Sequence, residues 1–173
     1  MGLLERVTGA QQMLSTDHAA LHAGAAYSAE ARDAALANAA YLSIAIKAPL
    51  SVYVHLKHYE PWFNGDYGIF SVIEGCTIAG GSTAGRNRNR ASLEEMQSTV
   101  FVGATITGGT EIEGAFVSGG SGILALQSFT GQRPLDIEWV LRPGTQYALK
   151  LLNNSGGNAG ASLWAFFYEE GRG

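Results

Sequence analysis

The stretch YLSIAIK at residues 41–47 decides the fold class, and VYVHLK at residues 52–57 repeats its pattern. In the first stretch the large apolar residues Leu42, Ile44 and Ile46 alternate with smaller or polar ones. Alternation with a period of two is typical of a strand that buries one face. The two stretches therefore predict two strands, which Pro49 separates.

Six further segments combine apolar residues with turn signals at their ends, and each predicts a strand. They are residues 69–74, 98–103, 110–117, 136–142, 146–152 and 161–169. Eight short strands are typical of a sandwich or barrel, not of a parallel α/β fold. We expect an all-β chain with a jelly-roll-like antiparallel β-sandwich over residues 41–173. An immunoglobulin-like sandwich is the alternative, although its Cys…Trp…Cys signature is absent.

Residues 1–40 differ in composition, since they are rich in alanine, and between Leu14 and Asn38 the only large apolar residues are Leu21, Tyr27 and Leu36. Ser15-Thr16-Asp17 has the residue types of a helix cap, and residues 28–33 have the composition of a second helix start. Neither helix has a wide apolar stripe. We therefore expect an extended or short-helical N-terminal arm that lies on a partner or stays loose.

Two long connections interrupt the predicted strands, at residues 77–91 and 118–134. Both are rich in glycine and small polar residues. Loops of this length in a compact domain are usually functional or disordered.

Composition limits the function. The 173 residues carry a net charge of −4, which argues against direct nucleic-acid binding. Only 15% of residues are charged, and glycine is abundant at 23 residues, as in a loop-rich β protein that covers its surface with partners. No apolar run reaches the roughly 18 residues of a membrane span, and the first residues lack a secretory signal, so we expect a protein made in a reducing cytoplasm.

Motifs for catalysis are missing. The single cysteine, Cys76, excludes an intrachain disulfide and is expected to be a small buried or half-buried residue. The chain has neither a Gly-x-Ser-x-Gly nor a phosphate-loop motif. His55 and His58, three apart on a strand, are expected on opposite faces. A cupin-like metalloenzyme needs a further histidine on a later strand, and none follows His58. We expect no catalytic residue, cofactor or metal, and keep the metalloenzyme as a remote alternative.

Two sets of residues are candidates for binding a partner. His18 and His22 are four apart, so a helix places them on one face. The spacing suits zinc, but no third ligand is evident, and an interface is favoured. Arg86, Arg88 and Arg90 alternate with asparagines, so an extended chain directs the three guanidinium groups to one side. There they can bind carboxylates or phosphates; the alternative is a solvated loop.

Several segments occur in an order that resembles a known family. They are residues 18–24, 44–49, 87–92, 137–147, 149–156 and 164–169. Over residues 16–170 this pattern of strands and turns resembles the head-decoration (cement) proteins of tailed bacteriophages and prophages. The resemblance implies a non-enzymatic, jelly-roll-like protein made in the bacterial cytoplasm. It implies attachment to the major capsid protein on the outside of the virion, as a dimer or trimer. Similar patterns occur in phage tail, baseplate and receptor-binding modules, which remain the alternative.

The last strand also indicates self-association. Trp164, Phe166 and Tyr168 are expected on one face and Phe167 on the other. A strand that is apolar on both faces is covered on both faces. We therefore expect a homo-oligomer, with no membrane or direct nucleic-acid contact.

Overall fold

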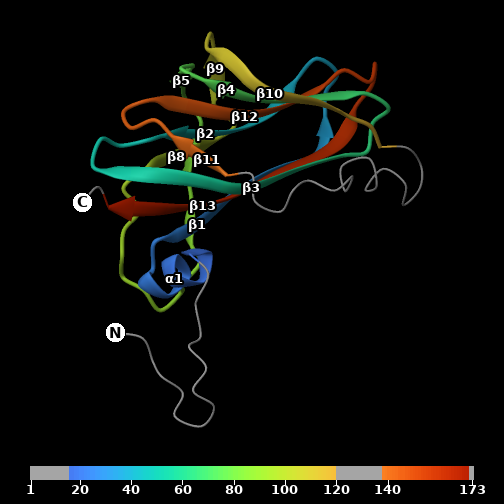
Figure 1. The fold of residues 1–173 in the computed structure, drawn as a ribbon. Helices are drawn as coiled ribbons and strands as arrows, with labels where there is room; N and C mark the ends of the chain where they lie inside the picture. Colours follow the sequence, from blue (N-terminus) through green and yellow to red (C-terminus); the bar gives the residue numbers. More distant parts are fainter. Residues whose placement is uncertain (1–15, 120–137, 172–173) are drawn as a thin grey trace.

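The computed structural model describes residues 16–119 and 138–171, which form a sandwich of antiparallel sheets (Figure 1). The elements are α1 Thr16–Ala23, β1 Ala26–Leu36, β2 Tyr41–Lys47, β3 Val52–Phe63, β4 Gly68–Glu74, β5 Thr77–Ala79, β6 Ser82–Ala84, β7 Arg86–Asn87, β8 Thr99–Val102, β9 Thr105–Thr107, β10 Thr110–Val117, β11 Trp139–Leu141, β12 Gln146–Asn153 and β13 Ala159–Gly171. The prediction of an all-β sandwich is confirmed.

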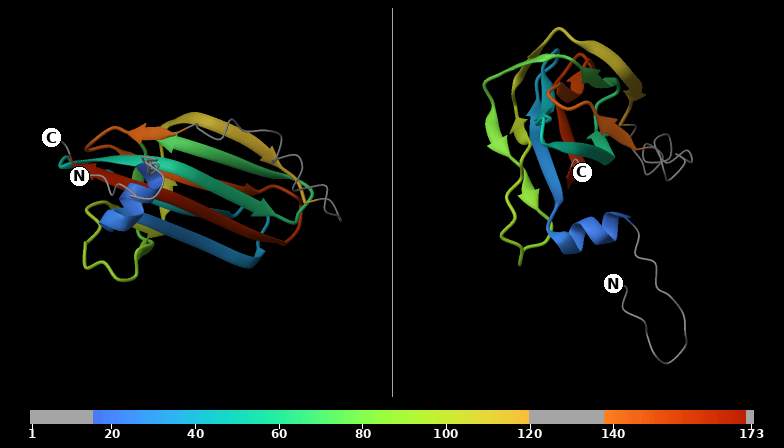
Figure 2. Two further views of the ribbon diagram at one scale, coloured as in Figure 1. Left: turned by 60° about the horizontal axis from the view of Figure 1, so that its bottom comes forward. Right: turned by 60° about the vertical axis from the view of Figure 1, so that its left-hand side comes forward.

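Two large sheets form the layers of the sandwich (Figure 2). The five-stranded sheet has the order β11-β3-β13-β1-β7, and the six-stranded sheet has the order β10-β4-β12-β2-β8-β6. A short ribbon, β5-β9, forms a third sheet. The first four strands alternate between the two large sheets, so the chain crosses the sandwich at each early turn.

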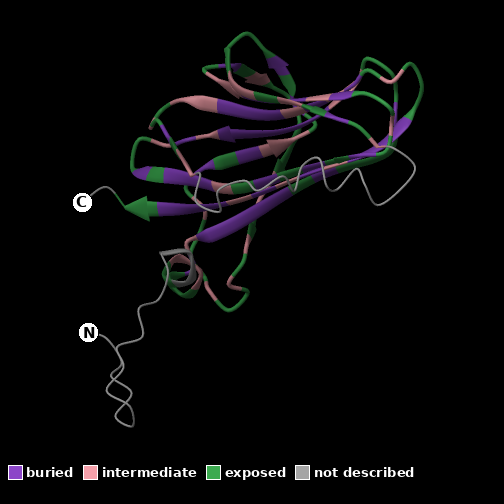
Figure 3. Ribbon diagram, turned by 45° about the vertical axis from the view of Figure 1, so that its right-hand side comes forward, coloured by how far each residue is buried: buried purple, intermediate pink, exposed green. Residues whose placement is uncertain are grey.

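The core lies between the two large sheets, where the buried residues gather (Figure 3). Ile44 and Ile46 face this core, as their alternation predicts. Ala45 faces the other way, into a smaller cluster with Cys76 and Ile106 beside the β5-β9 ribbon. The predicted burial of Cys76 is confirmed, and burial raises the pKa of its thiol.

Most predicted strands form, and β2 and β10 have the predicted bounds. The prediction of a continuous loop at residues 77–91 is wrong, because this stretch contains β5, β6 and β7. Most of the second predicted loop, at residues 120–134, lies outside the described residues. So do the first two residues of the strand predicted at 136–142.

The largest correction concerns the N-terminal arm. A helix forms at residues 16–23, but residues 26–36 form β1 inside the five-stranded sheet, where a second helix start was predicted. Tyr27 and Ala29 are buried in the core, and the Tyr27 ring stacks on Phe167 at 5.8 Å between centroids. The small alanine side chains do not prevent this strand from forming, because β13 pairs with β1 along its length. The prediction of an arm extending to residue 40 is therefore wrong from residue 26 onward.

A β-bulge in β3 makes the prediction that His55 and His58 lie on opposite faces wrong. His58 pairs with Phe166 and Leu56 pairs with Phe167, so Lys57 is an extra residue in β3. The extra residue reverses the alternation beyond it. His55 and His58 consequently lie on the same outer face of the sheet, not on opposite faces.

Candidate partner-binding groove

In the arginine segment, residues 86–90, exposed arginines alternate with half-buried asparagines. Arg86, Arg88 and Arg90 are exposed, while Asn87 and Asn89 are half-buried. Arg86 lies opposite Ser28 in the β1–β7 pair, and the Arg88 amide donates to the Ala26 carbonyl at 2.8 Å. The predicted separation of arginines from asparagines is therefore present in the structure.

The two asparagines fasten this segment to the end of α1, which lies beside it in Figure 2. Asn87 Nδ2 donates to the carbonyls of Gly24, at 2.7 Å, and of Glu94, at 3.1 Å. Asn89 Nδ2 donates to the His22 carbonyl at 3.2 Å. Four of the five predicted binding residues are thus brought to one end of the sandwich; His18 also lies in α1, but its side chain is outside the described part of the structure.

Gly24 permits this close packing. Its φ is +79°, a conformation that residues with a Cβ rarely adopt. A Cβ atom at this position would lie 2.0 Å from Ser92 Oγ. The absence of a side chain lets the turn after α1 approach the chain that follows the arginine segment.

A groove of about 1160 Å³ runs along this surface. Its lining includes the three arginines of the segment, and Arg32 and Trp164 from the five-stranded sheet. We call this hollow the arginine groove. Arg32 forms an ion pair with Glu30, which also lines the groove. Within residues 16–119 and 138–171 the structure gives no ion pair to Arg86, Arg88 or Arg90, all of which line the groove.

Glu169 fixes the chain beyond the arginine segment. Its buried carboxylate accepts hydrogen bonds from the amides of Gln97, at 2.9 Å, and Ser98, at 2.7 Å. The same carboxylate faces Tyr27: burial, reinforced by the charges of Glu169 and Glu94, raises the pKa of Tyr27 to about 12. The arginine segment is therefore fastened to α1, and the chain that follows it is fastened to β13 at Gln97 and Ser98.

A row of aromatic residues continues from the groove across the outer face of the five-stranded sheet. Trp164 stacks on Phe166 at 6.4 Å between ring centroids, and His58 packs edge-on against Trp164 at 5.5 Å. Phe167 faces the core from the same strand. The predicted division of β13 into two apolar faces is confirmed.

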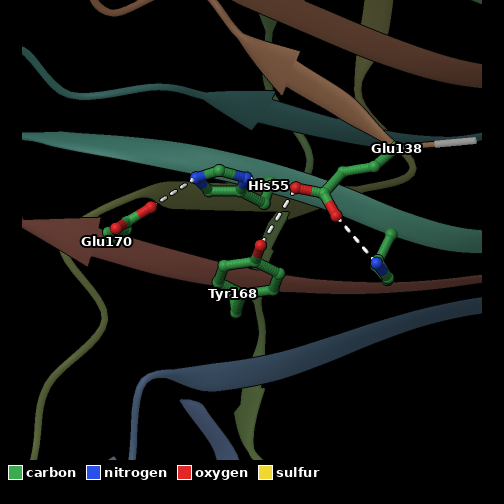
Figure 4. A network of polar contacts seen from close by, with 5 residues as sticks. His55, Glu138, Tyr168 and Glu170 are labelled. Carbon is green, nitrogen blue, oxygen red and sulfur yellow. Dashed lines mark hydrogen bonds and ion pairs between the residues drawn. The ribbon is translucent and has the colours of Figure 1, made fainter. Parts of the chain in front are cut away.

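A polar cluster occupies the far part of that face, and the sequence analysis did not predict it. Figure 4 shows His55 between Glu138 and Glu170. Its Nδ1 contacts Glu138, and its Nε2 lies 3.2 Å from Glu170 Oε2. Tyr168 donates to Glu138 at 2.9 Å, and its ring stacks on His55 at 4.4 Å.

Glu138 is the centre of this cluster. Partial burial raises the pKa of its carboxyl, but hydrogen bonds from Lys57, His55 and Tyr168 outweigh burial and lower the pKa below its ordinary value. Lys57 Nζ lies 2.8 Å from Glu138 Oε2. The cluster ties β11, β3 and β13 together.

Among the described residues, no group of three or more His, Cys, Asp or Glu side chains is arranged to hold a metal ion. No helix in the described ranges combines the length and apolar character of a membrane span. Comparison with known proteins gives no match among family models, curated proteins or solved structures.

Proposed function

We propose that this chain is a non-enzymatic virion structural protein that binds the outside of a tailed-phage capsid as a decoration, or cement, protein and stabilises the shell. Its partner in this proposal is the major capsid protein. The arginine groove supports the proposal most directly. Three exposed arginines line one hollow on a segment fastened to α1, and interfacial arginine is a frequent binding hot spot.

The strand order supports a jelly roll as the architecture of this protein. Eight strands, β1–β4 and β10–β13, make up four adjacent positions in each large sheet. Lettering them B to I in chain order gives G-D-I-B in one sheet and F-E-H-C in the other. This order agrees with the two Greek keys expected of a jelly roll, which supports that architecture.

Self-association is part of the same proposal. Trp164 and Phe166 are only partly covered on the outer face of β13, although Phe167 already fills the core side. Covering that face in a dimer or trimer removes apolar surface from water, at roughly 25 cal/mol per Å². Symmetric copies also raise the effective concentration of each weak attachment to a shell.

The direct test is sedimentation of purified protein with phage shells that lack it. Replacing Arg86, Arg88 and Arg90 by Ala is expected to weaken binding by at least about tenfold and to flatten its salt dependence, because exposed charges are screened within about 8 Å at physiological ionic strength. The control variant replaces Lys47, Arg142 and Lys150 by Ala, which removes the same charge elsewhere. Equal binding by the two variants would contradict a specific role for the groove.

A phage tail or receptor-binding module is the second candidate, favoured by the aromatic row on the outer face. Trp164, Phe166 and exposed Trp62 present ring surfaces on which a sugar or peptide ligand can stack. Gold labelling of virions with an antibody to this chain separates the two functions. Labelling over the whole shell supports decoration, and labelling confined to the tail supports the alternative.

A further inference from the structure

We propose that the open edge of β1, in the arginine groove, accepts an extended acidic segment of a partner protein as an added strand. This inference rests on the proposed function and names the chemistry of the segment that the groove binds.

The edge is open because β7 is short. β13 pairs with β1 from Ala26 to Leu36, but on the other side β7 pairs only with Tyr27 and Ser28. At Gly85, where φ is +116°, the chain before β7 turns away toward β6 and leaves this edge. The rest of β1 therefore has no neighbouring strand on its groove side among the described residues.

The backbone of this edge points into the groove. The Glu169 amide donates to the Ala25 carbonyl, and the Arg88 amide donates to the Ala26 carbonyl. Odd-numbered residues of β1 thus direct their amide and carbonyl groups toward β13, and even-numbered residues direct theirs toward β7. Beyond the end of β7, the main-chain groups of Glu30 and Arg32 face the arginine groove, which both residues line.

The side chains around this edge select the composition of an added strand. Ala29, Ala84 and Val102 line the groove and pack against the core, so they form an apolar floor. Arg86 lies opposite Ser28, on the outer face that Arg32 shares by alternation. A strand laid beside Glu30 and Arg32 therefore directs alternate side chains at the floor and at the guanidinium groups.

The charge of the arginines determines which side chains the added strand must carry on its outer face. Arg86, Arg88 and Arg90 form no ion pair within the described ranges, whereas the chain as a whole has a net charge of −4. Carboxylates placed beside guanidinium groups form charge-assisted hydrogen bonds, about twice as strong as neutral ones. The segment that fits is an extended chain in which apolar residues alternate with Asp or Glu, bound by strand addition.

The test uses the purified full chain and a fluorescein-labelled, end-capped peptide of about eight residues, alternating valine and glutamate. One control peptide replaces glutamate by lysine, and the other N-methylates alternate amides so that charge remains but strand pairing is lost. Fluorescence anisotropy is expected to show at least about tenfold tighter binding of the first peptide than of either control. Hydrogen exchange is expected to show new protection at the Glu30 and Arg32 amides.

Three results would overturn the proposal. Equal binding of the lysine peptide excludes selection of carboxylates, and equal binding of the N-methylated peptide excludes strand addition. Protection of the Glu30 and Arg32 amides in the oligomer without peptide means that a second copy already occupies the edge. Because these measurements use no shells, a failure to decorate shells while peptide binding persists counts against the proposed function alone.

Discussion

Asn87 and Gly24 are joined by a hydrogen bond of 2.7 Å that fixes the arginine segment to the turn after α1. Asn87 also accepts a bond from the Asn89 amide and donates to the Glu94 carbonyl, so one side chain organises the turn. The position of Arg86 and Arg88 therefore depends on the residue between them.

Replacing Asn87 by Ala is expected to lower the unfolding free energy by about 1–2 kcal/mol and to weaken shell binding, because several hydrogen bonds are lost together. Chemical denaturation and sedimentation with shells measure the two effects. Asn158→Ala, at an exposed position, is the control and is expected to change neither. Wild-type shell binding by Asn87→Ala would contradict the account of how the arginines are positioned.

Gly24→Ala is expected to destabilise more than Gly75→Ala. Both glycines have positive φ, so alanine costs roughly 1–2 kcal/mol of backbone strain at each. Only at Gly24 does the new Cβ also meet another residue, Ser92, and overpacking costs about 1–3 kcal/mol more. Equal losses of unfolding free energy in the two variants would show that the contact with Ser92 carries no energy.

Truncation separates the helix from the strand that follows it. Removing residues 1–23 deletes α1 and is expected to leave a folded sandwich. Removing residues 1–38 also deletes β1, with the buried side chains of Tyr27 and Leu36, and is expected to abolish cooperative unfolding. Thermal melts followed by circular dichroism distinguish the two, and a cooperative melt of the longer truncation would contradict the placement of β1.

Glu138 gives the fold a pH dependence. Its folded-state pKa lies below its ordinary value of 4.5, because the hydrogen bonds from Lys57, His55 and Tyr168 outweigh burial. A carboxyl with a lowered pKa stabilises the fold above its unfolded-state pKa, and this stabilisation is lost as pH falls through the folded-state value.

Glu138→Gln is therefore expected to be about 1–3 kcal/mol less stable than wild type at pH 7, with the difference shrinking below about pH 4.5. Denaturation curves from pH 3 to pH 7 measure it. A difference that stays constant over this range would mean that the charge of Glu138 does not contribute to stability.

The aromatic row leads to a prediction about mass. Light scattering at micromolar concentration is expected to give a dimer or trimer of the 18.2 kDa chain. Replacing Trp164 and Phe166 by Ser is expected to shift the mass toward one chain, because the partly covered rings lose their apolar contact. A wild-type mass of one chain would contradict the proposed homo-oligomer.

The strands that bury large residues were predictable from the sequence. Ile44 and Ile46 alternate with small residues, so β2 follows from a period of two. The strand β13 follows from its run of aromatic residues between Trp164 and Tyr168, which are enriched in strands. β1 was missed because its inward residues include Ala29 and Ala31, and alanine is depleted in strands. The sequence signal for β1 is a period of two, in which Tyr27, Ala29 and Ala31 alternate with the polar residues Ser28, Glu30 and Arg32.

Features of the site that depend on contacts between distant parts of the chain were harder to predict from the sequence. The alternation of Arg86, Arg88 and Arg90 predicted a common side, but not the addition of Arg32 from β1, because that strand was not expected. The bulge at Lys57 carries no local signature, so the shared face of His55 and His58 was missed. Glu138 meets His55 only through the pairing of β11 with β3, across 83 residues of sequence.

A cryo-EM map of the virion that carries this chain tests the central claim most directly. The account predicts density for the sandwich over the outside of the shell, with the arginine groove turned toward a capsid subunit. Density for this chain at the tail, or a shell-bound sandwich whose arginine groove faces solvent, would contradict it.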